Sequence, residues 1–198
     1  MSREPYTIGE GYILYPLADV DRDNHVELQR QINGDGTLFL VPGIKDMMWD
    51  TLLSDTNTTK LYSIFENNGD YCGCIELQQY HTDTPEIGLN LIETKRNQGI
   101  AAKVVKSLVQ TVCSERDIEY FLIRIMSNNP HSRYVFEKMG AVPIGEEEHP
   151  YVVLMNRLKT TLAQDTVNEI QGAIKDLMVD NDEDEFVYRY KLMPDVFD

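Results

Sequence analysis

An arginine and a glycine stand directly ahead of an apolar helical pattern, in the hexapeptide Arg96–Ala101 (RNQGIA). The N-terminus of a helix exposes unpaired backbone N–H groups and a partial positive charge, so it readily binds an anion. Gly99 would let the backbone come close to a pyrophosphate, and Arg96 would add a positive charge. On these residues alone, an anion site and an incidental helix start are equally favoured. The sequence lacks the Lys-Ser/Thr ending of a P-loop and a full Gly-x-Gly-x-x-Gly pattern, which argues against a nucleotide hydrolase or a Rossmann fold.

The segments around this hexapeptide predict strands on either side of a helix. Three strand-like runs separated by turn residues predict an antiparallel meander over Leu61–Glu66, Cys72–Tyr80 and Glu86–Ile92. Apolar residues at every fourth position from Ile100 to Val112 then predict a helix with one broad apolar face. The almost continuously apolar run Tyr120–Met126 predicts an interior strand that is covered on both faces.

A second, shorter helix is predicted from about His131 to Met139. Asn129 can cap its first turn, Pro130 suits the first helical position, and Gly140 can end it. This helix therefore begins directly after the interior strand, as the first helix begins after the meander.

The N-terminal part of the chain predicts a short strand over Tyr12–Leu17 and helices over Asp19–Asn33 and Ile44–Leu53. Alternating acids occur here, at positions 19, 21 and 23, and again at positions 180, 182 and 184. Neither run completes a calcium loop, because glycine is missing at the sixth position and a carboxylate at the twelfth. We interpret both acidic runs as solvated turns.

The C-terminal part predicts a strand over Ala141–Glu146, helical spacing from Tyr151 to Met178, and a last strand at Phe186–Leu192 (FVYRYKL). One or two helices would then be inserted between the last two strands. A competing interpretation makes Tyr151–Asn156 the last strand and the remainder an appendage.

Composition limits the classes of partner. The chain has 198 residues, which favours one domain, and its net charge of −15 argues against nucleic acid or an anionic membrane as a partner. We see no signal-peptide pattern and no apolar run long enough to span a bilayer. The three cysteines show no metal-binding spacing, so we expect incidental or buried thiols in a reducing cytoplasm and no metal site.

The order of these motifs resembles that of the GNAT superfamily of N-acetyltransferases. The stretch EIGLNLIETKRNQGIA, from Glu86 to Ala101, is similar to the family's acetyl-CoA-binding motif, a strand leading into Arg-x-x-Gly-x-Gly/Ala. The stretch NNPHSRYVFEKMGA is similar to its second signature, here Asn129, Ser132, Phe136, Lys138 and Gly140. The resemblance covers about residues 61–146. It covers the first 60 residues only in the order of their elements, and it does not reach the tail beyond position 149.

The resemblance implies an α/β GNAT fold: a mixed, mostly antiparallel sheet with a central, splayed parallel strand pair, flanked by helices. We predict one domain with a core of about residues 8–147. The apolar spacing of the tail, which the resemblance does not cover, adds a helical insertion at about 149–180 and a final strand at about 186–192. The resemblance also implies where acetyl-CoA binds. The pantetheine arm would pair with the backbone of Leu91, Ile92 and Glu93, and the pyrophosphate would rest on Arg96, Asn97, Gln98, Gly99, Ile100 and Ala101. Asn129, Ser132 and Phe136 would line the arm.

The catalytic groups that the resemblance implies are a backbone N–H near Leu91, which polarises the thioester carbonyl, and Glu86 as base. A base helps because an ammonium of pKa near 10 is deprotonated in only about one part in a thousand at neutral pH. A Glu that merely caps the strand edge is an equally favoured interpretation of Glu86. The family often has a tyrosine acid at the position of Phe136, so the acid is left open. Tyr134 lies about 200° away around the helix, so it is a poor substitute for that tyrosine. His131 could supply the proton, but a solvated or capping histidine is the favoured interpretation.

The sequence thus predicts a cytoplasmic N-acetyltransferase that uses acetyl-CoA to acylate an amine on a small molecule or peptide. The alternative is an inactive GNAT-fold module that binds acyl-CoA for sensing or scaffolding, which the phenylalanine at position 136 favours. The helical segment could also serve as a docking or dimerisation element, which would give a homodimer.

Overall fold

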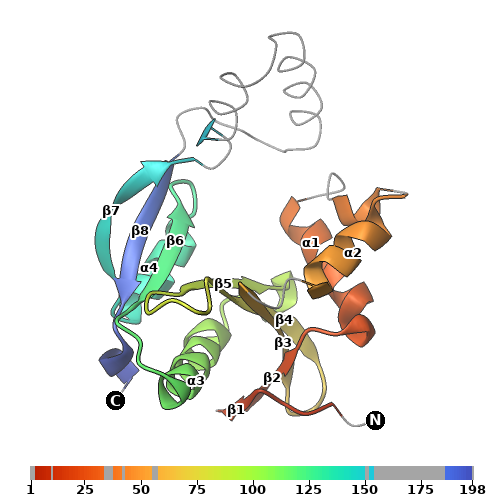
Figure 1. The fold of residues 1–198 in the computed structure, drawn as a ribbon, viewed down its shortest axis with the longest axis horizontal. Helices are drawn as coiled ribbons and strands as arrows, with labels where there is room; N and C mark the ends of the chain where they lie inside the picture. Colours follow the sequence, from red (N-terminus) through yellow and green to blue (C-terminus); the bar gives the residue numbers. More distant parts are fainter. Residues whose placement is uncertain are drawn as a thin grey trace.

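The computed structural model describes residues 3–9, 11–33, 38–41, 43–54, 58–149, 152–153 and 186–197. In this part of the chain, eight strands form one sheet in the order β1-β2-β3-β4-β5-β6-β8-β7 (Figure 1). The strands of the N-terminal half are β1 (Thr7–Gly9), β2 (Tyr12–Pro16), β3 (Thr59–Glu66), β4 (Tyr71–Gln78) and β5 (Glu86–Leu91). They pair antiparallel in chain order, so the predicted meander is confirmed.

The sheet changes direction between β5 and β6 (Phe121–Met126), which are parallel. Their pairing is limited to one residue pair, Glu86 with Leu122, supported by a 2.9 Å hydrogen bond from the Leu122 N–H to the Pro85 carbonyl. β5 continues to Leu91 and β6 to Met126, so the two strands part after their first residues. The predicted central splayed parallel pair is therefore confirmed.

Two helices pack on one face of the sheet. α3 (Ile100–Glu115) buries Ile100, Val104 and Leu108, as its apolar spacing predicts. α4 (Pro130–Lys138) begins after Asn129, whose Oδ1 accepts a 3.0 Å hydrogen bond from the Ser132 N–H. Side chains of both helices belong to one hydrophobic core together with alternate residues of the strands. We call this side the α3 face.

The last two strands are β7 (Val142–Glu148) and β8 (Phe186–Leu192). β8 lies between β6 and β7 and is antiparallel to both, so Phe186–Leu192 is the last strand, as the primary interpretation predicts. The competing assignment of the last strand to Tyr151–Asn156 is wrong. Apart from Val152 and Val153, the predicted helical insertion lies outside the described residues. A 3-10 turn at Pro194–Phe197 follows β8.

Helices α1 (Arg22–Asn33) and α2 (Lys45–Ser54) lie on the other side of the sheet from α3 (Figure 1). α1 contacts β4, so we call this side the α1 face. The chain enters α1 through a 3-10 turn at Asp19–Asp21, and a second such turn, Leu38–Leu40, contacts α2. None of the described helices is both long enough and apolar enough to span a membrane.

The prediction of a solvated acidic turn is wrong for Asp21, which is fully buried. Its carboxylate is 2.6 Å from an Arg3 guanidinium nitrogen and accepts a 2.8 Å hydrogen bond from the Ser63 hydroxyl. His25, one helical turn further on, is 2% exposed and packs near Trp49. A buried polar group needs partners, and the chain supplies them from β3 and the N-terminal segment, which sequence spacing does not reveal.

The prediction that β6 is covered on both faces is also wrong. Phe121, Ile123 and Ile125 are buried on the α3 face, but Arg124 on the α1 face is exposed. The apolar run is interrupted by a charge, and at that charge the α1 face of β6 is exposed. Cys72 and Cys74 on β4 are buried free thiols, as expected.

Candidate active site

The loop between β5 and α3 is open to solvent and ends at an uncapped helix N-terminus. Arg96, Asn97, Gln98 and Gly99 are all exposed. Asn97 and Gly99 have φ of 61° and 75°, in the left-handed region, and Gly99 is the N-cap of α3 without any side-chain cap. A Cβ built on Gly99 would meet nothing within 4 Å. Backbone N–H groups at the start of α3 are thus exposed beside free space, an arrangement that fits an anion.

Arg96 is tied to the end of β5. Its Nε donates a 3.0 Å hydrogen bond to the Leu91 carbonyl, while the Gln98 amide donates a 2.6 Å hydrogen bond to the Thr94 carbonyl. Between Leu91 and Arg96 the chain makes a 3-10 turn at Glu93–Lys95. These bonds hold a guanidinium within one loop of the α3 N-terminus, so the hexapeptide combines a charge with backbone donors.

The end of β5 directs backbone groups toward the gap between β5 and β6. The Ile92 N–H donates to the Cys72 carbonyl of β4 at 3.0 Å. Because N–H groups alternate sides along a strand, the Leu91 N–H points the other way, to the side where β6 has parted. The Glu93 N–H is taken by the Gln31 side chain of α1 at 3.0 Å. Of the three residues predicted to pair with the cofactor arm, Leu91 is the one whose N–H points into the gap.

The second signature lies at the same edge of the sheet, because α3 and α4 both start where a strand of the parallel pair ends. Asn129 is exposed, and its Oδ1 already caps α4. Ser132 is half-buried, and Phe136 is 7% exposed within the hydrophobic core. Tyr134 is 61% exposed and turned away from the core. Asn129 is thus an exposed capping residue at the start of α4, and Phe136 is a packing residue.

Glu86 begins β5 on the α1 face and is 6% exposed. Its Oε2 lies 2.8 Å from Arg124 Nε on β6. Arg124 also lies 3.2 Å from Glu147 on β7, and Glu147 lies 3.5 Å from Arg189 on β8. A chain of alternating charges therefore crosses four strands on this face. The predicted base is its first member, and one of its oxygens is occupied by a guanidinium.

Glu76 on β4 is a functional candidate that sequence reasoning missed. The β4–β5 register places it opposite Gly88 and beside the Gln78–Glu86 pair, on the α1 face. Gln78 donates a 3.0 Å hydrogen bond to Glu76 Oε1. Burial raises the pKa of Glu76, and the charge of Glu86 raises it further, against the lowering effects of the Gln78 bond and of Arg124. The period-two alternation of β4 places Glu76 on one face of the strand. Only the register with β5 shows that this face also carries Glu86 and Gly88.

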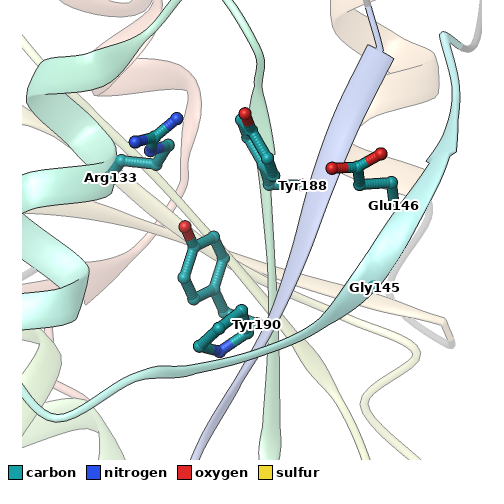
Figure 2. A pocket seen from close by; sticks show the side chains of 6 residues that line it. Arg133, Gly145, Glu146, Tyr188 and Tyr190 are labelled. Carbon is teal, nitrogen blue, oxygen red and sulfur yellow. The ribbon is translucent and has the colours of Figure 1, made fainter.

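A groove of about 500 Å³ lies elsewhere, between α4, β7 and β8. Figure 2 shows Arg133 of α4 facing Tyr188 and Tyr190 of β8, with Glu146 of β7 on the far side. The Arg133 guanidinium lies 4.6 Å from the Tyr188 ring centroid, and the Tyr190 hydroxyl donates a 2.8 Å hydrogen bond to Glu137. None of the residues predicted to bind the cofactor lines this groove.

A family model described as "Acetyltransferase (GNAT) domain" matches residues 38–142. No curated protein matches the chain in sequence.

Among solved structures, the chain is similar to spermidine N-acetyltransferase from Vibrio cholerae in complex with CoA and spermine. The TM-score is 0.67 at 12% identity, over 94% of this chain and 98% of that one. It is also similar to the spermidine/spermine N-acetyltransferase of Vibrio cholerae in complex with manganese ions, with a TM-score of 0.64 at 12% identity, over 93% of each chain. At this identity the two structures establish a shared fold.

Proposed function

The chain belongs to the GNAT family of acetyltransferases, and from that premise we propose that it transfers the acetyl group of acetyl-CoA to a cationic amine bound on the α1 face. The observation that carries the proposal is the parting of β5 from β6 after one residue pair, next to the uncapped N-terminus of α3. This leaves a strand edge with unused backbone donors beside an anion-binding loop. Few soluble ligands need both features, and acetyl-CoA has an amide-rich arm and a pyrophosphate.

The residues present fit acetyl-CoA at this place. The loop 96–101 would hold the pyrophosphate, because Gly99 leaves the approach to the α3 N-terminus open and Arg96 adds a positive charge. The Leu91 N–H would pair with the arm, and the Asn129 amide N–H₂ remains to donate, since its Oδ1 serves the cap. Acetyl-CoA supplies an activated thioester carbonyl.

The chain's own contribution to acyl transfer is positioning and charge stabilisation. A backbone N–H held by a sheet, such as that of Leu91, stabilises negative charge on a carbonyl oxygen without having to reorient. Phe136 has no proton to donate and packs in the core. A thiol of pKa about 8.5 is a good enough leaving group to depart without a dedicated acid. We therefore assign no general acid.

The acceptor class is inferred from charge. Glu76 and Glu86 lie side by side on the α1 face, beside the point where β5 and β6 part, and the whole chain has a net charge of −15. Desolvated carboxylates at a site favour a cationic ligand. Polyamines are the first acceptors to test, because the similar structure from Vibrio cholerae is a spermidine N-acetyltransferase in complex with spermine. Cys72 and Cys74 are buried thiols outside any disulfide, which fits a reducing compartment such as the cytoplasm.

The test is release of free thiol from acetyl-CoA across a panel of polyamines, amino acids, aminoglycosides and short peptides, with acetyl-CoA affinity measured by calorimetry on the same sample. Binding together with turnover on a cationic acceptor is the expected result. Binding without turnover on the whole panel would favour the inactive sensing module. Absence of acetyl-CoA binding would overturn the proposal, since the loop 96–101 would then be only the start of a helix.

A further inference from the structure

Glu76 is a carboxyl group that no motif of the sequence singles out, and it lies over the backbone of the strand whose end is open. We propose that Glu76 is the general base that accepts the proton of the acceptor ammonium, and that Gly88 is the residue that gives it room. This inference rests on the proposed acetyltransferase function.

The first step is the contact between Glu76 and Gly88. A Cβ built on Gly88 would lie 2.4 Å from Glu76 Oε1, 2.7 Å from its Cγ and 2.9 Å from its Cδ. The carboxyl therefore occupies the space that any other residue at position 88 would fill. Gln78 holds the same oxygen at 3.0 Å. A glycine in a strand interior weakens the strand and commonly marks the close approach of another group, and here that group is a carboxyl.

Glu86, the other carboxyl at this site, differs from Glu76 in being paired with an arginine. Glu86 is 6% exposed, and its Oε2 lies 2.8 Å from Arg124 Nε, so a guanidinium already offsets much of its negative charge. Arg124 belongs to β6 and Glu86 to β5, so this pair joins the two parallel strands where they begin to part. Glu86 thus serves as a positioning residue for the parallel pair. Among the ion pairs of the described residues, none joins Glu76 to an arginine, and Arg124 acts on Glu76 only through its charge.

The next step is the affinity of Glu76 for a proton. The charged or titratable groups that act on it are Glu86 from β5 and Arg124 from β6, while the Cys74 thiol is its neighbour on β4. Burial and the charge of Glu86 both raise the pKa of Glu76. A carboxylate with a raised pKa is a better base at neutral pH than an ordinary one, provided that it is still ionised.

The acceptor ammonium gives one proton through a bridging water to the Glu76 carboxylate. The amine lone pair forms a bond to the thioester carbonyl carbon, the carbon–sulfur bond breaks, and the electron pair leaves on sulfur. The thiolate takes the second proton from nitrogen, and Glu76 returns its own proton to solvent.

Three variants test the assignment by kcat/KM against pH on the acceptor found in the panel. Glu76→Gln should lower kcat/KM about 100-fold and remove the acid limb of the profile, because general-base catalysis contributes about 10²–10⁴. Gly88→Ala should also lower kcat by displacing the carboxyl. Glu86→Gln should keep the acid limb. Glu119→Gln, an exposed carboxylate beyond α3, controls for the loss of one charge and should behave as wild type.

Calorimetry separates this inference from the proposed function. The assignment is supported if the wild-type protein turns over acetyl-CoA, and Glu76→Gln loses the acid limb of the profile while its acetyl-CoA affinity is unchanged. If the wild-type protein turns over and the pH profile of Glu76→Gln keeps its acid limb, the assignment of Glu76 is overturned, while the proposed acetyltransferase function stands. Loss of the acid limb in Glu86→Gln but not in Glu76→Gln would also overturn the assignment, and would make Glu86 the base. If the wild type neither binds nor turns over acetyl-CoA, the proposed function fails first.

Discussion

Replacing Gly99 with alanine separates backbone strain from cofactor contact at the proposed pyrophosphate loop. Gly99 has φ 75° and ψ 7°, a left-handed conformation in which a Cβ costs about 1–2 kcal/mol. A Cβ at this position meets nothing within 4 Å, so no steric clash adds to that cost. We therefore expect Gly99→Ala to lower the free energy of unfolding by about 1 kcal/mol.

The effect on acetyl-CoA affinity should be larger than the strain. The methyl group would occupy the open space in front of the α3 N-terminus, where the pyrophosphate has to approach the backbone N–H groups. We expect the dissociation constant to rise at least about tenfold, which corresponds to about 1.4 kcal/mol. Urea denaturation measures the first quantity and isothermal calorimetry the second, on the same preparation.

Gly69→Ala is the matched control. Gly69 lies in the turn between β3 and β4 with φ 92°, and a Cβ there also meets nothing within 4 Å. It should cost a similar stability and leave acetyl-CoA affinity unchanged. If both variants lose the same stability and neither loses affinity, the pyrophosphate does not rest on this loop, and the reasoning from the helix N-terminus is refuted.

Three further substitutions test other parts of the structure. Arg96→Lys loses the Nε donor to the Leu91 carbonyl, so calorimetry should show acetyl-CoA affinity falling about tenfold despite the retained charge; unchanged affinity would exclude a guanidinium-specific role. Burial lowers the pKa of His25 from its ordinary value of 6.5 to about 4, so the unfolded chain binds the proton first as the pH falls. About 3 kcal/mol of stability should therefore be lost as the pH falls across that interval. His25→Gln should abolish this slope in urea titrations at several pH values, and a slope that persists would contradict the assignment. Asp21→Ala leaves Arg3 and Ser63 without their buried partner and should lower the free energy of unfolding by about 3 kcal/mol in urea titrations; a loss below about 1 kcal/mol would mean that water replaces the carboxylate.

Local chemistry explains which parts of the fold could be predicted. The turn residues between the meander strands, the fourth-residue spacing after Ile100 and the Asn129 cap each act within a few residues of chain, so their effects can be read from sequence. The order of the two helix starts also follows, because each comes directly after a strand of the parallel pair.

The missed features depend on contacts between distant segments. Asp21 is buried because Ser63 and Arg3 reach it, and nothing in the spacing of the acids at positions 19–23 indicates those partners. Glu76 acquires its environment from Gly88, through a register that a one-residue slip would invert. Arg124 interrupts an otherwise apolar strand, and the apolar run alone suggested cover on both faces.

An acidic chain that binds an anionic co-substrate has to rely on short-range donors. At physiological ionic strength the Debye length is about 8 Å, so most of the −15 net charge is screened at the α3 N-terminus. Backbone N–H groups and Arg96 act there at contact distance, where screening is weak. On the α1 face the same acidity favours binding of a cation, because the half-buried Glu76 and the buried Glu86 lie close together. The anionic co-substrate would thus bind at the end of β5 beside α3, and the cationic acceptor would bind on the α1 face of the sheet. Raising the salt concentration should accordingly weaken the binding of a cationic acceptor, because salt screens its long-range attraction to the net negative charge. Acetyl-CoA should lose less affinity, because salt also screens its long-range repulsion from that charge.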